Sequence, residues 1–141
     1  MDRKEFLASL GISAASFAIM NCAGCAKNSD GPSSGTTGPT TLNFTLDLNA
    51  SSNAALLNNG GFLISNDVIV VRKSAGNYIA LQRSCTHENY SLTYQPSNSR
   101  FYCSNHGATF TESGAVSNGP ANRSLSVYKT ELTGTNLRVY S

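Results

Sequence analysis

The chain has 141 residues, 40% of them hydrophobic and 13% charged, a length that suits one modest domain and leaves little room for a second. The formal net charge is +2, which is too small to indicate nucleic-acid binding, and the composition lies outside the range of disordered chains. Four cysteines and two histidines occur, and both histidines lie in one short region.

Residues 1–25 have the pattern of a targeting segment. Arg3 and Lys4 give this segment a positive start, and residues 6–26 contain no charge. The apolar core at residues 10–20 is interrupted by Gly and Ser, as in the hydrophobic region of a signal peptide. An uncleaved membrane helix is the alternative, since twenty-one uncharged residues are barely long enough to span a bilayer.

Two short motifs within this leader refine the prediction. Residues 3–7 resemble the twin-arginine export signal, with Lys4 in place of the second arginine. Residues 22–25, Cys-Ala-Gly-Cys, resemble a bacterial lipobox, in which small residues precede a cysteine that becomes lipidated. Cys25 is the better candidate for lipidation, because Cys22 follows a bulky Met and a polar Asn. We therefore expect an exported protein of the cell envelope, anchored by lipid on the periplasmic or outer side of a membrane.

Residues 26–40 form the next part of the chain, and eleven of these fifteen residues are Gly, Pro, Ser or Thr. Such a composition predicts a flexible tether, because it offers no means of burying an apolar core. A tether of this kind would let a membrane-anchored domain reach a partner. The folded domain is then expected at residues 41–141.

Short stretches of strand type, separated by turn residues, make up the expected domain. Residues 42–48 alternate strictly between apolar and polar side chains, which predicts a half-buried strand. Residues 68–72 are mostly β-branched, which predicts a strand buried on both faces or nearly so. The pattern favours an all-β fold, an antiparallel sandwich or barrel. Further strands are expected at residues 62–65, 78–82, 125–128 and 136–140, with a single helical turn or a bend at residues 54–57.

The chemically distinctive part of the chain is a set of two cysteines and two histidines. One residue separates Cys85 from His87, two separate Cys103 from His106, and fifteen residues lie between the two pairs. Thiolate is a soft ligand and imidazole a borderline one, so the set suits iron or zinc better than magnesium or calcium. Each pair must sit in a tight loop that directs both side chains at one point.

This Cys-x-His and Cys-x-x-His-Gly pattern resembles the two-loop motif of Rieske [2Fe-2S] proteins. The resemblance extends to residues 78–81 ahead of the first loop and to residues 119–121, a Gly-Pro-Ala segment. In the family, the Gly-Pro segment forms a third loop that covers the cluster. The likeness spans roughly residues 42–141 and implies a Rieske-like antiparallel β-sandwich or barrel with a two-loop cluster-binding subdomain.

The resemblance also implies one [2Fe-2S] cluster per chain. In the family, two cysteines hold one iron and two histidines hold the other, which here assigns Cys85 and Cys103 to one iron and His87 and His106 to the second. Two neutral imidazoles in place of two thiolates make the cluster less negative, which raises reduction potentials to roughly −150 to +300 mV.

Four positions depart from the high-potential members of the family. Those members carry a further cysteine in each loop, which together form a disulfide, and the corresponding positions here are Tyr90 and Asn105. Those members also place a Ser and a Tyr hydroxyl near the cluster, where Ala108 and Phe110 stand in this chain. Fewer hydrogen-bond donors stabilise the reduced cluster less, so we expect a potential in the lower part of the family range.

Other interpretations of the same residues stay open. A structural zinc site would use the same ligand types, although zinc fingers pair like ligands at other spacings. A Cys85–Cys103 disulfide would leave the two histidines unexplained. Tyr90, Tyr94 and Phe101 are candidates for a docking surface beside the site, the alternative being that they belong to the core.

The resemblance implies a one-electron carrier, or the electron-transfer component of a membrane-associated redox chain. The partner would be another redox protein, for example a quinol- or cytochrome-linked complex. The alternative is a non-redox structural or binding module with zinc or no metal at the same site. No GxGxxG motif or Gly-rich phosphate loop occurs, and both histidines are already assigned to the metal, so a stand-alone enzyme is not expected.

Overall fold

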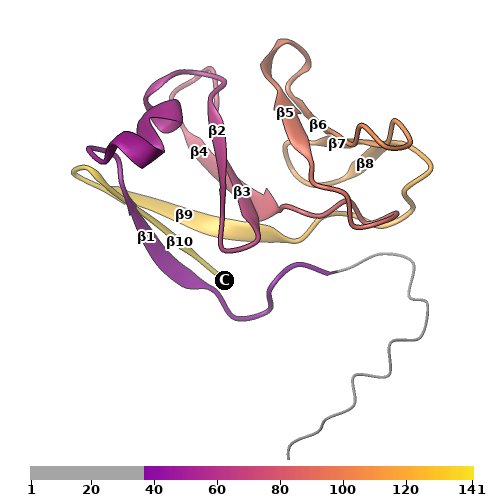
Figure 1. The fold of residues 1–141 in the computed structure, drawn as a ribbon, viewed down its shortest axis with the longest axis horizontal. Helices are drawn as coiled ribbons and strands as arrows, with labels where there is room; N and C mark the ends of the chain where they lie inside the picture. The colour runs from indigo at the N-terminus through magenta and orange to yellow at the C-terminus, as the bar shows by residue number, and fades with distance from the viewer. Residues whose placement is uncertain (1–36) are drawn as a thin grey trace, which may run out of the picture. The chain divides into compact units, whose positions relative to one another are not determined.

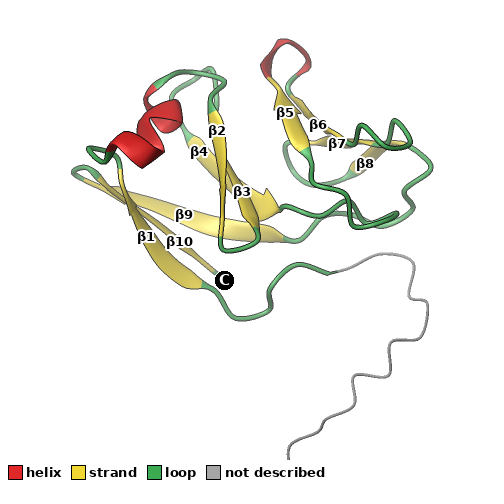
Figure 2. Ribbon diagram, in the orientation of Figure 1, coloured by secondary structure: helices red, strands yellow, loops and turns green. Residues whose placement is uncertain are grey.

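The structure, a computed structural model, describes residues 37–141, and these residues fold mainly into short strands (Figures 1 and 2). Ten strands and two 3-10 helices occur in the described part of the chain. In chain order they are β1 (Asn43–Asp47), η2 (Ser51–Leu57), β2 (Phe62–Ser65), β3 (Val68–Arg72), β4 (Tyr78–Gln82), β5 (Thr93–Gln95), η3 (Pro96–Asn98), β6 (Arg100–Tyr102), β7 (Thr109–Thr111), β8 (Val116–Asn118), β9 (Val127–Thr133) and β10 (Asn136–Tyr140).

The larger sheet has six antiparallel strands in the order β1-β10-β9-β4-β3-β2. The strands predicted at residues 62–65, 68–72, 78–82 and 136–140 are confirmed at those residues. The helical turn expected at residues 54–57 is part of η2, which is longer than the prediction. The all-β, antiparallel fold class is therefore confirmed.

The smaller sheet has four antiparallel strands in the order β5-β6-β7-β8. In the sequence it lies between β4 and β9, and these two strands of the larger sheet pair directly with each other. Beyond the last paired residues, the Gln82 backbone N–H donates to the Ser126 carbonyl at 2.9 Å. The smaller sheet and its loops are therefore one insertion that leaves the larger sheet and returns to it at neighbouring strand ends (Figure 1).

Strand β3 separates two apolar cores. Val68 and Val70 pack into one core, together with residues of η2, β1 and β10. Ile69 and Val71 belong to the other core, which contains the inner residues of the smaller sheet and both motif cysteines. Successive side chains of a strand point to opposite faces, and all four of these are fully buried. The prediction that this strand is buried on both faces is confirmed.

Gly38 and Pro39, near the end of the segment expected to be a tether, contact the larger sheet. The Gly38 N–H donates to Gln82 Oε1 at 3.2 Å, and the Tyr128 hydroxyl donates to the Pro39 carbonyl at 2.9 Å. A Cβ atom at Gly38 would lie 2.6 Å from the Gln82 Cβ, so the chain can approach this closely only with glycine there. These contacts attach the chain to the domain from Gly38 onward.

The leader at residues 1–25, the lipidation candidate Cys25 and the tether up to residue 36 lie outside the described residues. Between residues 37 and 141, the structure has no helix of the length and apolar character needed to cross a membrane. Export and lipid anchoring therefore stay predictions.

Candidate metal centre

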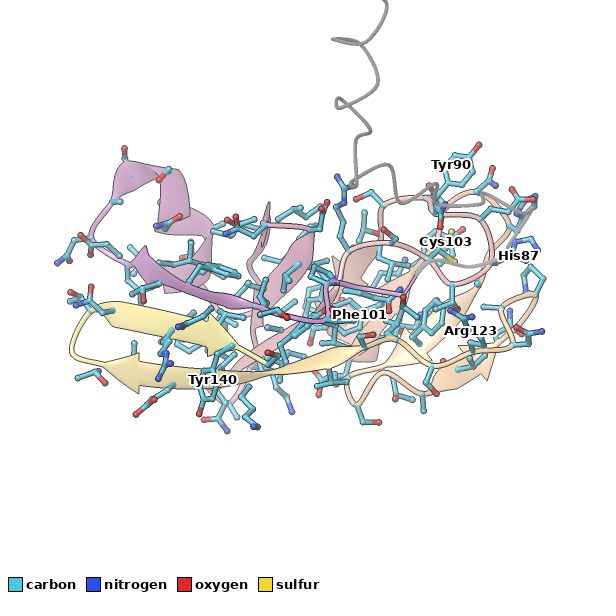
Figure 3. All side chains as sticks on the ribbon, turned by 90° about the horizontal axis from the view of Figure 1, so that it is seen from below. His87, Tyr90, Phe101, Cys103, Arg123 and Tyr140 are labelled. Carbon is cyan, nitrogen blue, oxygen red and sulfur yellow. The ribbon has the colours of Figure 1, made fainter. Side chains whose placement is uncertain are left out.

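Three loops meet beside the smaller sheet, and the first two carry the Cys/His motif. The first loop, residues 83–92, joins β4 to β5, and the second, residues 103–108, joins β6 to β7. The third loop, residues 119–126, joins β8 to β9. Figure 3 shows His87 of the first loop and Cys103 of the second close together at the edge of the domain.

Backbone hydrogen bonds close the first loop around its cysteine. The Cys85 N–H donates to the Tyr90 carbonyl at 2.8 Å, and the Asn89 N–H donates back to the Cys85 carbonyl at 3.0 Å. Asn89 has a φ of 59°, in the left-handed region that Asn adopts more readily than most residues. The loop therefore turns sharply within six residues.

The second loop repeats the same frame of hydrogen bonds. The Cys103 N–H donates to the Ala108 carbonyl at 2.8 Å, and the Gly107 N–H donates to the Cys103 carbonyl at 3.0 Å. Gly107 has a φ of 78° and occupies the position that Asn89 holds in the first loop. The hydrogen-bond frames of the two loops match residue for residue. However, the histidine lies two positions after the cysteine in the first loop and three positions after it in the second. This shift is the structural origin of the unequal spacings.

The two histidines direct the same ring nitrogen at one point. Nδ1 of His87 lies 3.1 Å from Nδ1 of His106, and the two rings meet nearly at right angles, at 84°, with their centroids 4.8 Å apart. His87 is half-buried and His106 is exposed. Because both Nδ1 atoms face inward, the opposite Nε2 side of each ring is directed outward.

The two cysteines of these loops lie in the core. Cys85 is fully buried, Cys103 is 2% exposed, and both carry free thiols. Burial raises the pKa of the Cys85 thiol, the backbone N–H of His87 opposes this shift, and the neighbouring Cys103 thiol adds to it. A positive metal at this point would reverse the balance, because thiols deprotonate when they coordinate a metal.

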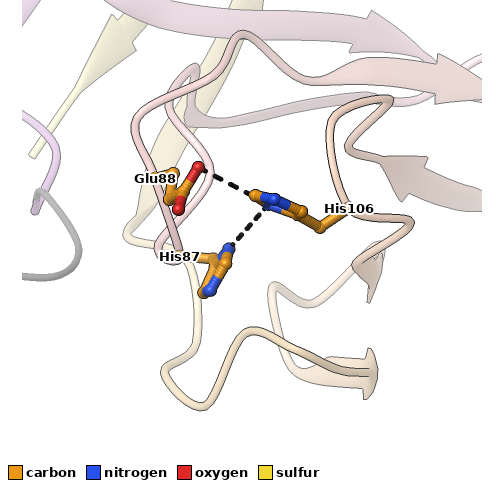
Figure 4. Close-up of side chains that lie close together, drawn as sticks. All are labelled: His87, Glu88 and His106. Carbon is orange, nitrogen blue, oxygen red and sulfur yellow. Dashed lines mark hydrogen bonds and ion pairs between the residues drawn. The ribbon is translucent and has the colours of Figure 1, made fainter.

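Glu88 and Asn105 join the two loops at the surface. The Asn105 Nδ2 donates to Glu88 Oε2 at 2.9 Å, and the same carboxylate oxygen lies 3.5 Å from His106 Nδ1 (Figure 4). The side-chain atoms of His87, Glu88 and His106 that could bind a metal ion all lie within 4.8 Å of one another. Neither Glu88 nor Asn105 was predicted to take part in the site from the sequence.

The third loop and the end of β8, which leads into it, are hydrogen-bonded to the other two loops. The hydroxyl of Thr86, a residue only 2% exposed, donates to the Arg123 carbonyl at 2.7 Å. The Asn118 Nδ2 donates to the Gly107 carbonyl at 3.3 Å. Ala121 is buried in the same core cluster as the two cysteines. Of the Gly-Pro-Ala segment, Ala121 therefore packs into the core that holds the cysteines, whereas Gly119 and Pro120 are exposed.

The fold and this arrangement of loops agree with a comparison of sequences. Residues 51–129, more than half of the chain, match the Rieske [2Fe-2S] domain family. The chain belongs to the Rieske family. Its cofactor is accordingly a [2Fe-2S] cluster, and its chemistry is Rieske-type electron transfer.

Two solved structures resemble this Rieske domain. The cyanobacterial plasma membrane Rieske protein PetC3 from Synechocystis PCC 6803 is 36% identical, over 52% of this chain and 76% of that one, with a TM-score of 0.48. The ferredoxin of carbazole 1,9a-dioxygenase from Nocardioides aromaticivorans IC177 is 21% identical, over 58% of this chain and 86% of that one, with a TM-score of 0.50. No curated protein matches the sequence.

The residues of this Rieske domain fit the cofactor. Two nitrogens bound to one tetrahedral ion at about 2.0–2.1 Å are about 3.3 Å apart, as zinc sites show. The 3.1 Å between the histidine Nδ1 atoms is close to that separation. The buried thiols would supply the softer pair of ligands, shielded from water. Their free state contradicts the alternative of a Cys85–Cys103 disulfide.

The aromatic residues considered for docking behave differently from one another. Tyr94 and Phe101 are 4% and 0% exposed and pack against each other with ring centroids 5.3 Å apart, so they are core residues. The docking hypothesis is wrong for these two, because strand pairing of β5 with β6 turns both side chains inward. Tyr90 is 50% exposed and projects from the domain beside the site (Figure 3).

Proposed function

We propose that this Rieske protein is a one-electron carrier, or the electron-transfer component, of a membrane-associated redox chain. In this proposal Cys85 and Cys103 bind the inner iron of the cluster, and His87 and His106 bind the outer iron. The observation that carries it is the meeting of the two Nδ1 atoms, 3.1 Å apart, from two loops whose cysteines are buried free thiols. A duplicated frame of backbone hydrogen bonds shapes the two loops that carry both pairs.

Each part of the site has a separate task in this function. The buried cysteines exclude water from one side of the cofactor, which itself supplies the one-electron chemistry when bound. The histidines present the other side at the surface, within reach of a redox partner. The first loop is held to the third through the bond from Thr86 to Arg123, and the second loop is held to the end of β8 through the bond from Asn118 to Gly107. These hydrogen bonds limit how far the loops move when the charge of the cluster changes.

The environment favours a potential in the lower part of the family range. Ala108 and Phe110 are fully buried beside the site, and neither side chain carries a hydrogen-bond donor. Hydrogen bonds to the sulfurs stabilise the reduced, more negative cluster, so fewer donors lower the reduction potential. A midpoint potential near +300 mV, the upper end of the family range, would contradict this part of the proposal.

The position at a membrane rests on the sequence of the leader. We propose export and lipid attachment at Cys25, with residues 26–36 giving reach to the domain. A quinol- or cytochrome-linked complex would suit an electron carrier held in this way. Full-length protein should then fractionate with membranes, and Cys25→Ala should release it. The matched variant Cys22→Ala should stay bound, and equal release of both variants would contradict lipidation at Cys25.

The purified full-length protein provides the test of the main proposal. We expect two irons and two inorganic sulfides per chain, a reddish-brown colour and a reversible one-electron titration. Cys103→Ser and His106→Asn should lose the cluster, whereas Ser104→Ala, an exposed neighbour in the same loop, should retain it. A colourless protein that contains zinc would support the alternative of a non-redox structural or binding module.

A further inference from the structure

Glu88 occupies a particular place in the duplicated loop frame. Counted from the cysteine of each loop, Glu88 in the first loop corresponds to His106 in the second, and Asn105 corresponds to His87. The frame therefore brings four side chains to the mouth of the site, two of them the histidines. The other two, Glu88 and Asn105, meet across the gap between the loops (Figure 4 shows Glu88).

The contact between Glu88 and Asn105 is a hydrogen bond between loops that no covalent bond joins. Asn105 Nδ2 lies 2.9 Å from Glu88 Oε2, and these residues are seventeen positions apart in the sequence. A bond to a charged acceptor is stronger than one between neutral groups. It ties the tip of one ligand loop to the tip of the other, and both of its ends lie next to His106 Nδ1, with Asn105 Nδ2 at 3.0 Å and Glu88 Oε2 at 3.5 Å.

The carboxylate also places a negative charge next to one of the ligands. Glu88 Oε2 is 3.5 Å from His106 Nδ1, the nitrogen directed at the metal. Reduction adds a negative charge to the cluster, and a nearby fixed negative charge opposes it by Coulomb repulsion. Half of the Glu88 side chain is exposed, so solvent reduces this effect without removing it.

We propose that Glu88 positions the two ligand loops through Asn105 and that its charge lowers the reduction potential of the site. This inference rests on the proposed function, because it concerns the cluster that the two loops hold. Glu88 is in this view a positioning residue, and its two effects are separable by substitution. Gln at position 88 keeps an oxygen that accepts the bond from Asn105 but removes the charge. Ala at position 105 keeps the charge but removes the bond.

The test uses the full-length protein with its cluster bound. Glu88→Gln should shift the reduction equilibrium toward the reduced form by about threefold to tenfold, which is about 28 to 59 mV for one electron. Its rate of cluster loss, followed by visible absorbance in the presence of a chelator, should lie between those of the wild type and Asn105→Ala, because the bond from Asn105 then ends on a neutral acceptor. Glu131→Gln, the same change on β9 of the larger sheet, should alter the equilibrium by less than about twofold.

Asn105→Ala tests the bond between the loops. We expect its cluster to be lost at least about threefold faster than in the wild type, with a smaller shift of potential than Glu88→Gln gives. Ser104→Ala, the exposed neighbour of Asn105, should lose its cluster at the wild-type rate. Asn105→Ser, which also lacks the amide donor, serves in place of Asn105→Ala if circular dichroism shows that the latter does not fold.

Two results would overturn the inference while leaving the proposed function intact. One is a midpoint potential of Glu88→Gln that equals that of Glu131→Gln. The other is cluster loss from Asn105→Ala at the same rate as from Ser104→Ala. A wild-type protein without iron and sulfide is a different outcome, since it would overturn the proposed function itself.

Discussion

Tyr94 donates a hydrogen bond to Glu112, with 2.5 Å between the hydroxyl oxygen and Oε1 of the carboxylate. The other carboxylate oxygen of Glu112 lies 2.8 Å from Lys73 Nζ. Tyr94 belongs to β5 and Glu112 directly follows β7, whereas Lys73 directly follows β3 of the larger sheet. The three groups therefore connect the two sheets through one chain of polar contacts.

This contact predicts a loss of stability at alkaline pH. Burial and the bond to Glu112 raise the pKa of Tyr94 to about 12, from its ordinary value of about 10. The unfolded chain therefore releases the proton at lower pH than the folded domain does. Tyr94 therefore makes its full contribution to the free energy of unfolding below about pH 10. As the pH rises toward 12, this contribution falls by up to about 1.4 kcal/mol per pH unit.

Denaturant unfolding at several pH values measures this effect. Tyr94→Phe should be about 1 kcal/mol less stable than the wild type at neutral pH, because it lacks the hydrogen bond. Its stability should fall less than that of the wild type between about pH 10 and 12, because the titrating group is gone. Tyr90→Phe, which removes an exposed hydroxyl, is the control. Equal slopes for the wild type and Tyr94→Phe would contradict the prediction.

The left-handed turn of the second loop predicts a difference between two substitutions at one position. Gly107 has a φ of 78°, and a Cβ atom there would meet no other atom within 4 Å. Gly107→Ala should therefore destabilise the domain by about 1 kcal/mol through backbone strain alone. Gly107→Asn should lose less, because Asn89 already adopts this conformation in the first loop. Thermal unfolding of both variants gives the comparison, and a more stable Ala variant would refute it.

The buried amide of Gln82 predicts a larger loss of stability. Its Oε1 accepts from the N–H groups of Gly38 and Ser126, and its Nε2 donates to the Ser84 carbonyl at 2.7 Å. Gln82→Leu should cost about 2 to 3 kcal/mol of unfolding free energy, because it removes three hydrogen bonds and leaves these half-buried backbone groups without this partner. Gln95→Leu, at a partly exposed position on β5, should cost less than about 1 kcal/mol. Similar losses for the two variants would argue against this role of Gln82.

Thr86 predicts a link between the third loop and retention of the cluster. Thr86→Val keeps the shape of the side chain but removes the 2.7 Å bond to the Arg123 carbonyl. We expect a loss of about 1 kcal/mol in stability and faster release of the cluster to a chelator. Thr93→Val, whose hydroxyl is exposed and makes a weaker contact of 3.4 Å, should behave as the wild type. If both variants release the cluster alike, the third loop does not secure the site through Thr86.

Much of the larger sheet could be predicted from the sequence because most of its strands carry a regular pattern, although the strand expected at residues 125–128 lies at Val127–Thr133. The alternation of apolar and polar residues around β1 predicts a strand with one buried face. The β-branched run of β3 predicts a strand with both faces buried. None of the four strands of the smaller sheet was predicted, since each has only three residues. Their existence depends on pairing with one another, which no local pattern reports.

The four motif residues could be named from sequence, but their surroundings could not. The spacing of cysteine and histidine in each loop is a local property of the chain. The meeting of Glu88 with Asn105 depends on how two separate loops face each other, and a pair of common polar residues gives no warning of it. The burial of Phe101 was likewise hidden, because an aromatic residue next to a ligand loop suits a surface or a core equally well.

The insertion of the smaller sheet has a consequence for protein engineering. Residues 83–126 start and finish at the adjoining ends of β4 and β9, as one long hairpin connection would. A module with neighbouring ends can be excised and replaced by a tight turn, or transplanted between two antiparallel strands of another protein. The host would have to offer an apolar surface like that of Ile69, Val71 and Leu81, on which this module rests.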